Sequence, residues 1–547
     1  MKAIICLPVD FEANQFGLAA RLDESIDGAP VLYHAVSRLR LSDDYRVVCM
    51  FKDTAALEKA RDMLAGLDCD FLHTQAADVP NREFLVRARL WSIDSWRGGM
   101  GWTTYWDEAG APAALAEAME TFDADTVGLI TPDSPLADPR LASQMLAWHR
   151  EHLKKARVTM TGVPPGLAPA FFSGDVVRSF AEAQLTPAAS MSYRSEHPQR
   201  DLAASQAHFE ADMALRTAPW RLTAHSLRQM EMLESLSQLG ASPRGASAGE
   251  AVAALRSNGR LWAGPIPSRI EIEPTSRFDV APYYLADYMH AREPVDMDQE
   301  VFEKIVQSTA PYRDCLLSLE GLGEPLLHGG IEKMVTAAVR AGVLGVHIST
   351  SGLCLDRGRF SALRDAGLDV LSVRTGAATP EGYQRLYGKG QDGFTPATAA
   401  LKMAFAERRK SEIPAPLLAA EMTKLRRLED EIEPFYNHWL KNCDWPVIRP
   451  YNDFAGQISD HATIHMRTSQ RIPCRKIFTE LYIDASGTAW PCRQDIMKTR
   501  PLGDAAREGL AALWRGDFLE ELRAAHLCGD WGFFTPCLAC KDWYYHI

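Results

Sequence analysis

The stretch Cys474-Arg-Lys-Ile-Phe-Thr-Glu-Leu-Tyr-Ile-Asp-Ala-Ser-Gly487-Thr-Ala-Trp-Pro-Cys492 places two cysteines at the ends of a predicted β-hairpin. Alternating residues form the first strand, Asp-Ala-Ser-Gly forms the turn, and a second strand leads to Cys492. Further along, Cys537-Leu-Ala-Cys540 adds two thiols. Four thiolates at this spacing are typical of one metal centre, either zinc or a four-iron cluster.

The composition is that of a globular protein. The chain has 547 residues, of which 46% are hydrophobic and 24% charged, so we expect about three domains of roughly 150 to 200 residues each. The net charge of -12 argues against nucleic acid as a partner, because phosphate binding needs clustered Lys and Arg. The apolar run 3–7 is too short for a signal peptide or a membrane span, so we expect a cytoplasmic protein.

The eleven cysteines are unevenly distributed. Five lie in the C-terminal region, where Cys528 accompanies the four already named. In a reducing compartment such a local group binds metal more often than it forms disulfides.

The region 1–240 predicts a doubly wound parallel sheet. Apolar strands at 2–7, 45–51 and 125–131 alternate with helical stretches such as 30–41. Asp133 follows the third strand, at the carboxyl edge where open α/β sheets bind ligands.

Two segments of this region resemble the sugar-activating cytidylyltransferases: Asp27-Gly28-Ala-Pro30 and Thr131-Pro-Asp133-Ser-Pro135. The resemblance implies a nucleotide-diphospho-sugar fold, a nucleotide or nucleotide-sugar ligand, and Asp133 as a magnesium ligand. However, Asp10 and Glu12 occupy a loop where that family has cations. His225 stands in place of the second metal aspartate, although magnesium prefers oxygen ligands. We therefore expect that this region does not catalyse nucleotidyl transfer. The site around Asp133 is then either vestigial or binds a nucleotide or sugar without chemistry.

A small, polar segment at 241–265 predicts a linker, and serial strand-helix units over 266–460 predict a full or partial parallel barrel. Three strand ends of this barrel resemble those of radical S-adenosylmethionine (SAM) enzymes. They are Gly323-Glu324-Pro325, the segment 347–352 and the segment 372–383. The resemblance implies that Gly323, Glu324 and Pro325 belong to a SAM site.

The cluster-binding cysteines of that family are missing. Phe278, Pro282 and Leu285 occupy the three positions of its C-x-x-x-C-x-x-C motif, and none can bind iron. We expect that radical SAM chemistry is lost, so the barrel is a scaffold or binds SAM or another small ligand without cleaving SAM.

The region 461–547 resembles the SPASM domain, which binds auxiliary iron-sulfur clusters. Cys474, Cys492, Cys537 and Cys540, with a helical insert over 505–525, match its short form with one cluster. The resemblance favours a 4Fe-4S cluster, whereas spacing alone leaves zinc open. We interpret Cys528 as a bystander.

The whole chain is similar to the spiro-SPASM proteins of spirochaetes, as judged also by Pro450-Tyr-Asn-Asp-Phe-Ala-Gly456. We expect an electron-transfer, ligand-binding or scaffold protein that works with a redox partner. The alternative is an enzyme that modifies sugars or the cell envelope.

Overall fold

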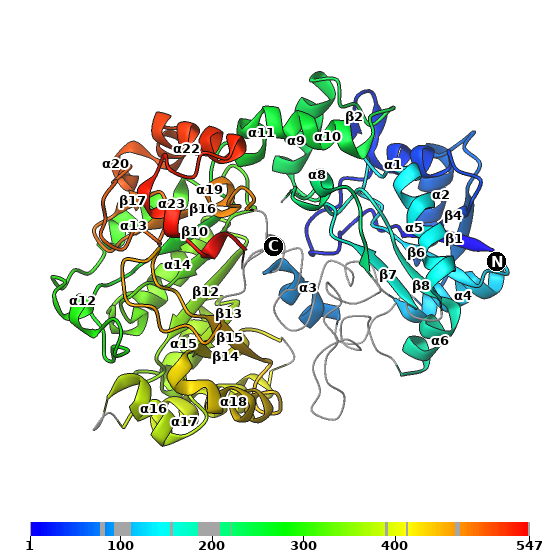
Figure 1. Cartoon of the computed structure of the whole chain (residues 1–547). Helices are drawn as coiled ribbons and strands as arrows, with labels where there is room; N and C mark the ends of the chain where they lie inside the picture. The colour runs from blue at the N-terminus through cyan, green and yellow to red at the C-terminus, as the bar shows by residue number, and fades with distance from the viewer. Residues whose placement is uncertain are drawn as a thin grey trace. The chain divides into compact units, whose positions relative to one another are not determined.

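The computed structural model describes residues 2–76, 82–91, 111–153, 157–183, 208–218, 220–388, 392–411, 414–464 and 471–544. The chain divides into two compact units, 1–262 and 263–546 (Figure 1). Every helix within these described ranges is too short or too polar to cross a membrane.

The first unit is built on a seven-stranded sheet of order β5-β4-β1-β6-β8-β7-β9. Its strands are β1 (Ala3–Pro8), β4 (Arg46–Phe51), β5 (Asp70–His73), β6 (Thr126–Leu129), β7 (Val158–Thr161), β8 (Ala170–Ser173) and β9 (His208–Phe209). The first four in this order are parallel, as predicted, while β8 runs antiparallel to both β6 and β7. A separate two-stranded ribbon joins β2 (Ser25–Ile26) to β3 (Ala29–Pro30).

Helices cover this sheet because their apolar stripes match its faces. One face packs against α4 and α6 through a core that includes Ile4, Val127 and Phe172. Asp138 caps α5 by accepting hydrogen bonds from Arg140 N and Leu141 N. The helices are α1 (Val31–Leu39), α2 (Thr54–Met63), α3 (Arg82–Leu90), α4 (Pro112–Thr121), α5 (Pro139–His152), α6 (Gly174–Ala183), α8 (Met213–Arg216) and α9 (Leu227–Gln238).

The segment 241–265, predicted as a linker, contains the helices α10 (Ala248–Ser257) and α11 (Gly259–Ala263). The Arg38 guanidinium donates to the carbonyls of Pro243 and Ala246, and Asp138 accepts from Ala248 N. These bonds attach most of the segment to the first unit. The predicted division of the remainder into 266–460 and 461–547 stays a prediction.

The second unit holds a nine-stranded sheet of order β15-β14-β13-β12-β11-β10-β16-β17-β18. The strands from β15 to β16 are all parallel, and β17 and β18 are antiparallel. They are β10 (Arg269–Ile272), β11 (Leu316–Leu319), β12 (Gly345–Thr350), β13 (Val370–Val373), β14 (Leu417–Lys424), β15 (Trp445–Pro450), β16 (Glu480–Ile483), β17 (Thr488–Trp490) and β18 (Gly503–Asp504). Six serial units therefore form an open, partial barrel.

The strand β16 extends the barrel sheet. It belongs to the C-terminal hairpin but lies parallel to β10, with Arg269 opposite Glu480 and Ile272 opposite Ile483. The predicted hairpin of β16 and β17 is present, and Gly487 adopts a positive φ of 84° in its turn. The first strand of the hairpin between Cys474 and Cys492, two of the predicted metal ligands, is thus the seventh parallel strand of this sheet.

The helices of the second unit alternate with its strands. In α14, Ile331, Met334, Val335 and Ala338 are buried at helical spacing, which explains why this stripe faces the sheet. The helices are α12 (Ala286–His290), α13 (Gln299–Gln307), α14 (Ile331–Arg340), α15 (Arg357–Asp365), α16 (Pro380–Tyr387), α17 (Phe394–Arg408), α18 (Ile432–Trp439), α19 (Lys476–Thr479), α20 (Ala505–Glu508), α21 (Leu510–Trp514), α22 (Asp517–Cys528) and α23 (Thr535–Ala539).

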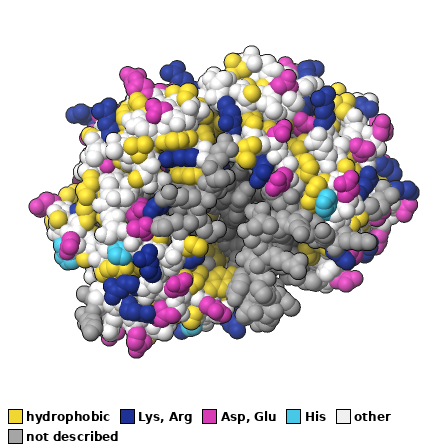
Figure 2. Space-filling model, viewed as in Figure 1, with side chains coloured by type: hydrophobic (Ala, Val, Ile, Leu, Met, Phe, Trp, Pro, Cys, Tyr) yellow, Lys and Arg dark blue, Asp and Glu magenta, His cyan; other side chains and the backbone are white. Residues whose placement is uncertain are grey.

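Surface charge is mixed. On the face shown in Figure 2, the described Lys and Arg side chains are interspersed with Asp and Glu and do not form a continuous basic stripe.

Candidate metal centre and barrel mouth

The four predicted ligands come from three places in the fold. Cys474 is buried just before α19, and Cys492 follows β17. Cys537 lies within α23, and Cys540 ends that helix. Cys528, by contrast, is exposed at the end of α22.

The four thiols lie within one another's electrostatic field. Burial, followed by the charges of Cys540 and Cys537, raises the pKa of Cys474 well above its ordinary value. Burial, followed by the charge of Cys474, raises the pKa of Cys492. Burial, followed by the charge of Cys540, raises the pKa of Cys537 to about 12. Burial and Asp542 raise the pKa of Cys540 to about 11. Four such thiols ionise together only when a cationic group compensates their charge.

Backbone donors and cations surround the sulfurs. Gln494 N donates to Cys492 Sγ at 3.4 Å, and Asp542 N donates to Cys540 Sγ at 3.3 Å. The Arg471 guanidinium donates to the Cys537 carbonyl at 2.6 Å. N–H···S hydrogen bonds and nearby cations stabilise the thiolates of an iron-sulfur cluster and tune its potential. The residues present therefore fit such a cluster.

Among the described residues, no three His, Cys, Asp or Glu side chains converge as ligands of a single metal ion would. A four-iron cluster distributes its thiolates around a cube instead of around one ion.

Charged groups beside the cysteines connect this centre to the barrel. Arg493, next to Cys492, forms an ion pair of 3.0 Å with Glu271 on β10. Lys476 pairs with Asp542 at 2.7 Å. The carboxylates hold both cations near the cysteines.

An apolar cluster fills the barrel mouth where the radical SAM cysteines were expected. Phe278 packs against a cluster that contains Leu285, Met289, Phe454 and Ile496. Leu285 is 6% exposed, and its amide donates to the Pro282 carbonyl at 2.9 Å. The loop thus packs on an apolar cluster that it shares with Phe454 and Ile496 from later segments of the chain.

The carboxylate of Glu324 is bound by other side chains and a backbone amide of the same chain. Its side chain is 1% exposed and forms an ion pair of 2.9 Å with Arg374. It also accepts from Ser351 N at 2.7 Å and from Thr350 Oγ1 at 2.5 Å. Pro325, the third predicted SAM-site residue, begins the short helix η3 (Pro325–Leu327).

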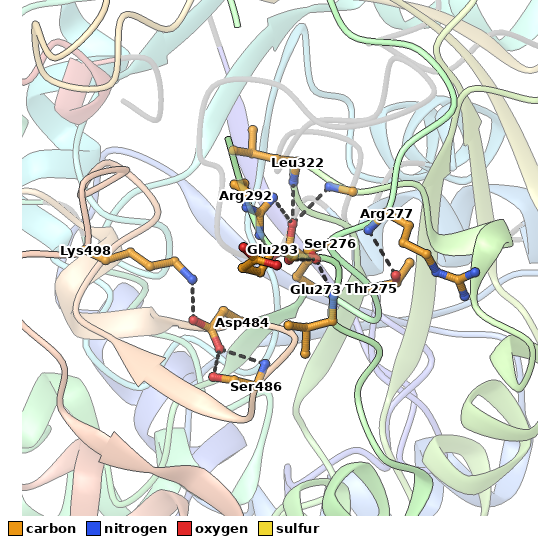
Figure 3. A network of polar contacts seen from close by, with 12 residues as sticks. Glu273, Thr275, Ser276, Arg277, Arg292, Glu293, Leu322, Asp484, Ser486 and Lys498 are labelled. Carbon is orange, nitrogen blue, oxygen red and sulfur yellow. Dashed lines mark hydrogen bonds and ion pairs between the residues drawn. The ribbon is translucent and has the colours of Figure 1, made fainter. Parts of the chain in front are cut away.

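Glu273, which the sequence reasoning missed, anchors the segment before Glu324 (Figure 3). Its carboxylate accepts from Leu322 N at 3.1 Å and Gly323 N at 2.9 Å, and it pairs with Arg292 at 2.5 Å. A side chain at position 323 would meet Thr275 O at 1.8 Å, so this approach requires glycine. The sequence feature that could have indicated this role is the position of Glu273, an acid at the end of the first barrel strand and directly before Pro274.

Asp133 lies in the first unit, beside a cavity of about 150 Å³ that Gln15, Lys52 and Pro132 also line. Gln15 Nε2 donates to Asp133 Oδ2 at 3.3 Å, whereas Oδ1 is buried without a hydrogen-bond partner among the described residues. Burial raises the pKa of this carboxyl. His225, which stands where the resemblance implies a second metal aspartate, is buried, and its Nδ1 lies 2.8 Å from Thr223 Oγ1.

A comparison with protein families matches residues 474–541 to SPASM, described as an iron-sulfur cluster-binding domain. The match contains all four cysteines and confirms the predicted resemblance of this region. An uncharacterized protein of Treponema pallidum (strain Nichols) is 26% identical over 236 residues, which is 39% of this chain. The chain spans only 63% of the length of that relative.

Three solved structures are similar to parts of the chain. SuiB of Streptococcus suis bound to precursor peptide SuiA is 13% identical, with 57% of this chain and 84% of SuiB covered and a TM-score of 0.40. BtrN in complex with AdoMet and 2-DOIA is 15% identical, with coverages of 50% and 93% and a TM-score of 0.36. A cytidylyltransferase from Leptospira borgpetersenii is 11% identical, with coverages of 48% and 95% and a TM-score of 0.33.

Proposed function

We propose, from the premise that residues 474–541 form a SPASM iron-sulfur cluster-binding domain, that this protein holds one 4Fe-4S cluster and does not cleave SAM. Cys474, Cys492, Cys537 and Cys540 are its ligands. When bound, such a cluster supplies one-electron transfer, and four thiolates leave it no open site for a substrate.

The proposed loss of SAM cleavage rests on the loop at the barrel mouth. Phe278 and Leu285 belong to an apolar cluster, so the loop offers no thiolate for a second iron-sulfur cluster. Arg374 pairs with Glu324, the acid that the resemblance assigns to the SAM amino group. An internal cation thus takes the place that a ligand cation would need.

The cluster then serves electron transfer to a partner protein or supports the fold. The second role is favoured by β16, which pairs with β10 and leads through its hairpin to Cys492. Because metal binding contributes free energy to the fold that presents its ligands, cluster binding stabilises the edge of the barrel.

The test is iron, sulfide and zinc analysis of protein purified without oxygen. We expect about four irons and four sulfides per chain. Cys537→Ala should lose them, whereas the matched Cys528→Ala variant should retain them. Zinc without sulfide would contradict the proposal, as would full cluster content in Cys537→Ala.

A second assay addresses the barrel. The reconstituted protein, incubated with SAM and dithionite, should produce no 5'-deoxyadenosine above the level of a protein-free control. Production that depends on the protein would refute the loss of radical SAM chemistry.

A second candidate function is ligand binding by the first unit, and the unpartnered Oδ1 of Asp133 favours it. A buried carboxylate oxygen beside a cavity can accept a hydrogen bond or bind a cation. Calorimetry with CTP and magnesium should give a binding signal that Asp133→Ala removes. No heat of binding, or equal binding by the variant, would exclude this candidate.

A further inference from the structure

One face of the second unit's parallel sheet carries a polar or charged side chain on every strand from β10 to β15. Strand pairing places on this polar face Glu271, Ser318, His347, Ser372, Glu421 and Arg449. The neighbouring positions Ile272, Ile348 and Leu371 project from the opposite face and are buried. Parallel sheets usually bury apolar residues on both faces. Packing alone therefore does not explain the polar face.

Ion pairs hold the arginines of the polar face in place. Arg449 pairs with Glu421 at 2.6 Å, and Arg493, which follows β17, pairs with Glu271 at 3.0 Å. The side chains of Arg449 and Arg493 are nonetheless 37% and 26% exposed. Both guanidiniums are thus fixed by a carboxylate and still accessible, as donors of a binding site are.

The carboxylate of Glu320, at the end of β11, accepts no hydrogen bond from the described residues. Its Oε2 lies 3.9 Å from Arg449 Nη1 and 4.0 Å from Arg493 Nη1, and the side chain is 13% exposed. Close by, Glu271 Oε1 and Arg449 Nε are buried without a hydrogen-bond partner among the described residues. Such unsatisfied polar atoms indicate that water or a ligand completes their hydrogen bonds.

A hydroxyl group fits the gaps around Glu320. A separation of 3.9 or 4.0 Å is too long for a direct hydrogen bond, but an oxygen atom can lie about 2.8 Å from both ends of it. That oxygen must donate to the carboxylate and accept from the guanidinium, and a hydroxyl does both. An ammonium group only donates, and a carboxylate or phosphate only accepts. The two gaps share Glu320 Oε2, so they suit two hydroxyls on neighbouring carbons.

The charges of the polar face also favour a neutral ligand. Carboxylates and guanidiniums are interleaved there, and they belong to Glu271, Glu320 and Glu421 and to Arg269, Arg449 and Arg493. A strongly anionic or cationic ligand would meet like charge at close range. A ligand that offers only hydroxyls meets no such repulsion.

We propose that the polar face binds a neutral cyclic polyol, either a sugar or a cyclitol. Two neighbouring hydroxyls of its ring bridge Glu320 to Arg449 and Arg493. The site uses neither the four cysteines nor Asp133, so it goes beyond the functions proposed above.

The test is saturation-transfer NMR of the full-length protein with its cluster. The probes are D-glucose, D-mannose, D-galactose and myo-inositol, each at about 10 mM, which reveals a Kd of about 1 mM. We expect at least one probe to bind, and cyclohexanol, with a single hydroxyl, to bind at least ~10-fold more weakly. Binding of the three hexoses alone identifies a sugar site, and binding of myo-inositol alone identifies a cyclitol site.

Two variants locate the site. Glu320→Leu removes the shared acceptor and should weaken binding at least ~10-fold. Glu303→Leu is the matched control, because Glu303 is an exposed acid on α13 of the same unit that accepts a hydrogen bond from Gln299. It should bind the probe as the wild type does.

Hydrogen exchange of the wild-type protein gives a readout that needs no variant. The bound probe should slow exchange in the peptides 316–324 and 445–451, which carry Glu320 and Arg449. The proposal is overturned if no probe binds, which leaves water as the occupant, or if exchange slows only in other peptides. Equal binding by Glu320→Leu also overturns it. The wild-type experiments decide the question even if that variant fails to fold.

Discussion

Replacing Arg292 by Leu should destabilise the barrel unit strongly. The Glu273 side chain is 0% exposed, and that of Arg292 is 13% exposed (Figure 3). Among the described residues, Arg292 is the only cation that forms an ion pair with Glu273, so the substitution leaves a fully buried carboxylate without one. The donors Leu322 N, Gly323 N and Tyr482 Oη remain. Breaking a buried pair by removing one partner costs about 3–5 kcal/mol.

The companion variant is Glu273→Gln, combined with Arg292→Leu. An uncharged amide still accepts a hydrogen bond but leaves no buried charge, so the double variant should be more stable than Arg292→Leu by about 1–3 kcal/mol. Arg277→Leu is the matched control. Arg277 and Asp296 are 43% and 44% exposed, and an exposed pair contributes about 0–1 kcal/mol.

The assay is urea unfolding of the full chain combined with hydrogen exchange of the peptide 316–324. The amides of Leu322 and Gly323 should exchange faster in Arg292→Leu, because the carboxylate that accepts from them is no longer held. The reasoning is refuted if Arg292→Leu costs no more than Arg277→Leu, or if exchange of this peptide is unchanged.

Three further predictions use the described contacts. Gly323→Ala should lower the urea midpoint markedly because its Cβ would meet Thr275 O at 1.8 Å, whereas Gly329→Ala, which meets nothing within 4 Å, should be nearly neutral. Burial lowers the pKa of His149 to about 4. Its contribution to the free energy of unfolding is therefore present above the ordinary pKa of about 6.5 and is lost as the pH falls toward 4. Unfolding measured from pH 7 to pH 4 should show a loss of roughly 3 kcal/mol that is absent in His149→Gln. Burial raises the pKa of Asp133, so its contribution to the free energy of unfolding falls as the pH rises through the folded-state pKa. Asp133→Asn should therefore have a higher melting temperature than the wild type at pH 8, with a smaller difference at pH 4. An equal difference at both pH values would contradict this.

Local patterns in the sequence predicted most of the elements. The strands predicted at 2–7 and 45–51 and the hairpin around Gly487 appear as expected, because alternation, turn residues and helical stripes act within a few residues of one another. Cysteine spacing predicted a metal centre for the same reason. The resemblance of this region to the SPASM domain is confirmed by the family comparison. The segment 241–265 illustrates the limit. Its small, polar residues predicted a linker, but only the structure shows that Arg38 donates to the carbonyls of Pro243 and Ala246.

The sequence by itself thus determined where the four cysteines stand and that Phe278, Pro282 and Leu285 replace a cluster motif. Only the tertiary structure decided that β16 joins the barrel sheet and that Arg374 reaches Glu324. These are pairings between residues far apart in the chain. They depend on how sheets and helices pack, and no periodicity within a single segment carries that information.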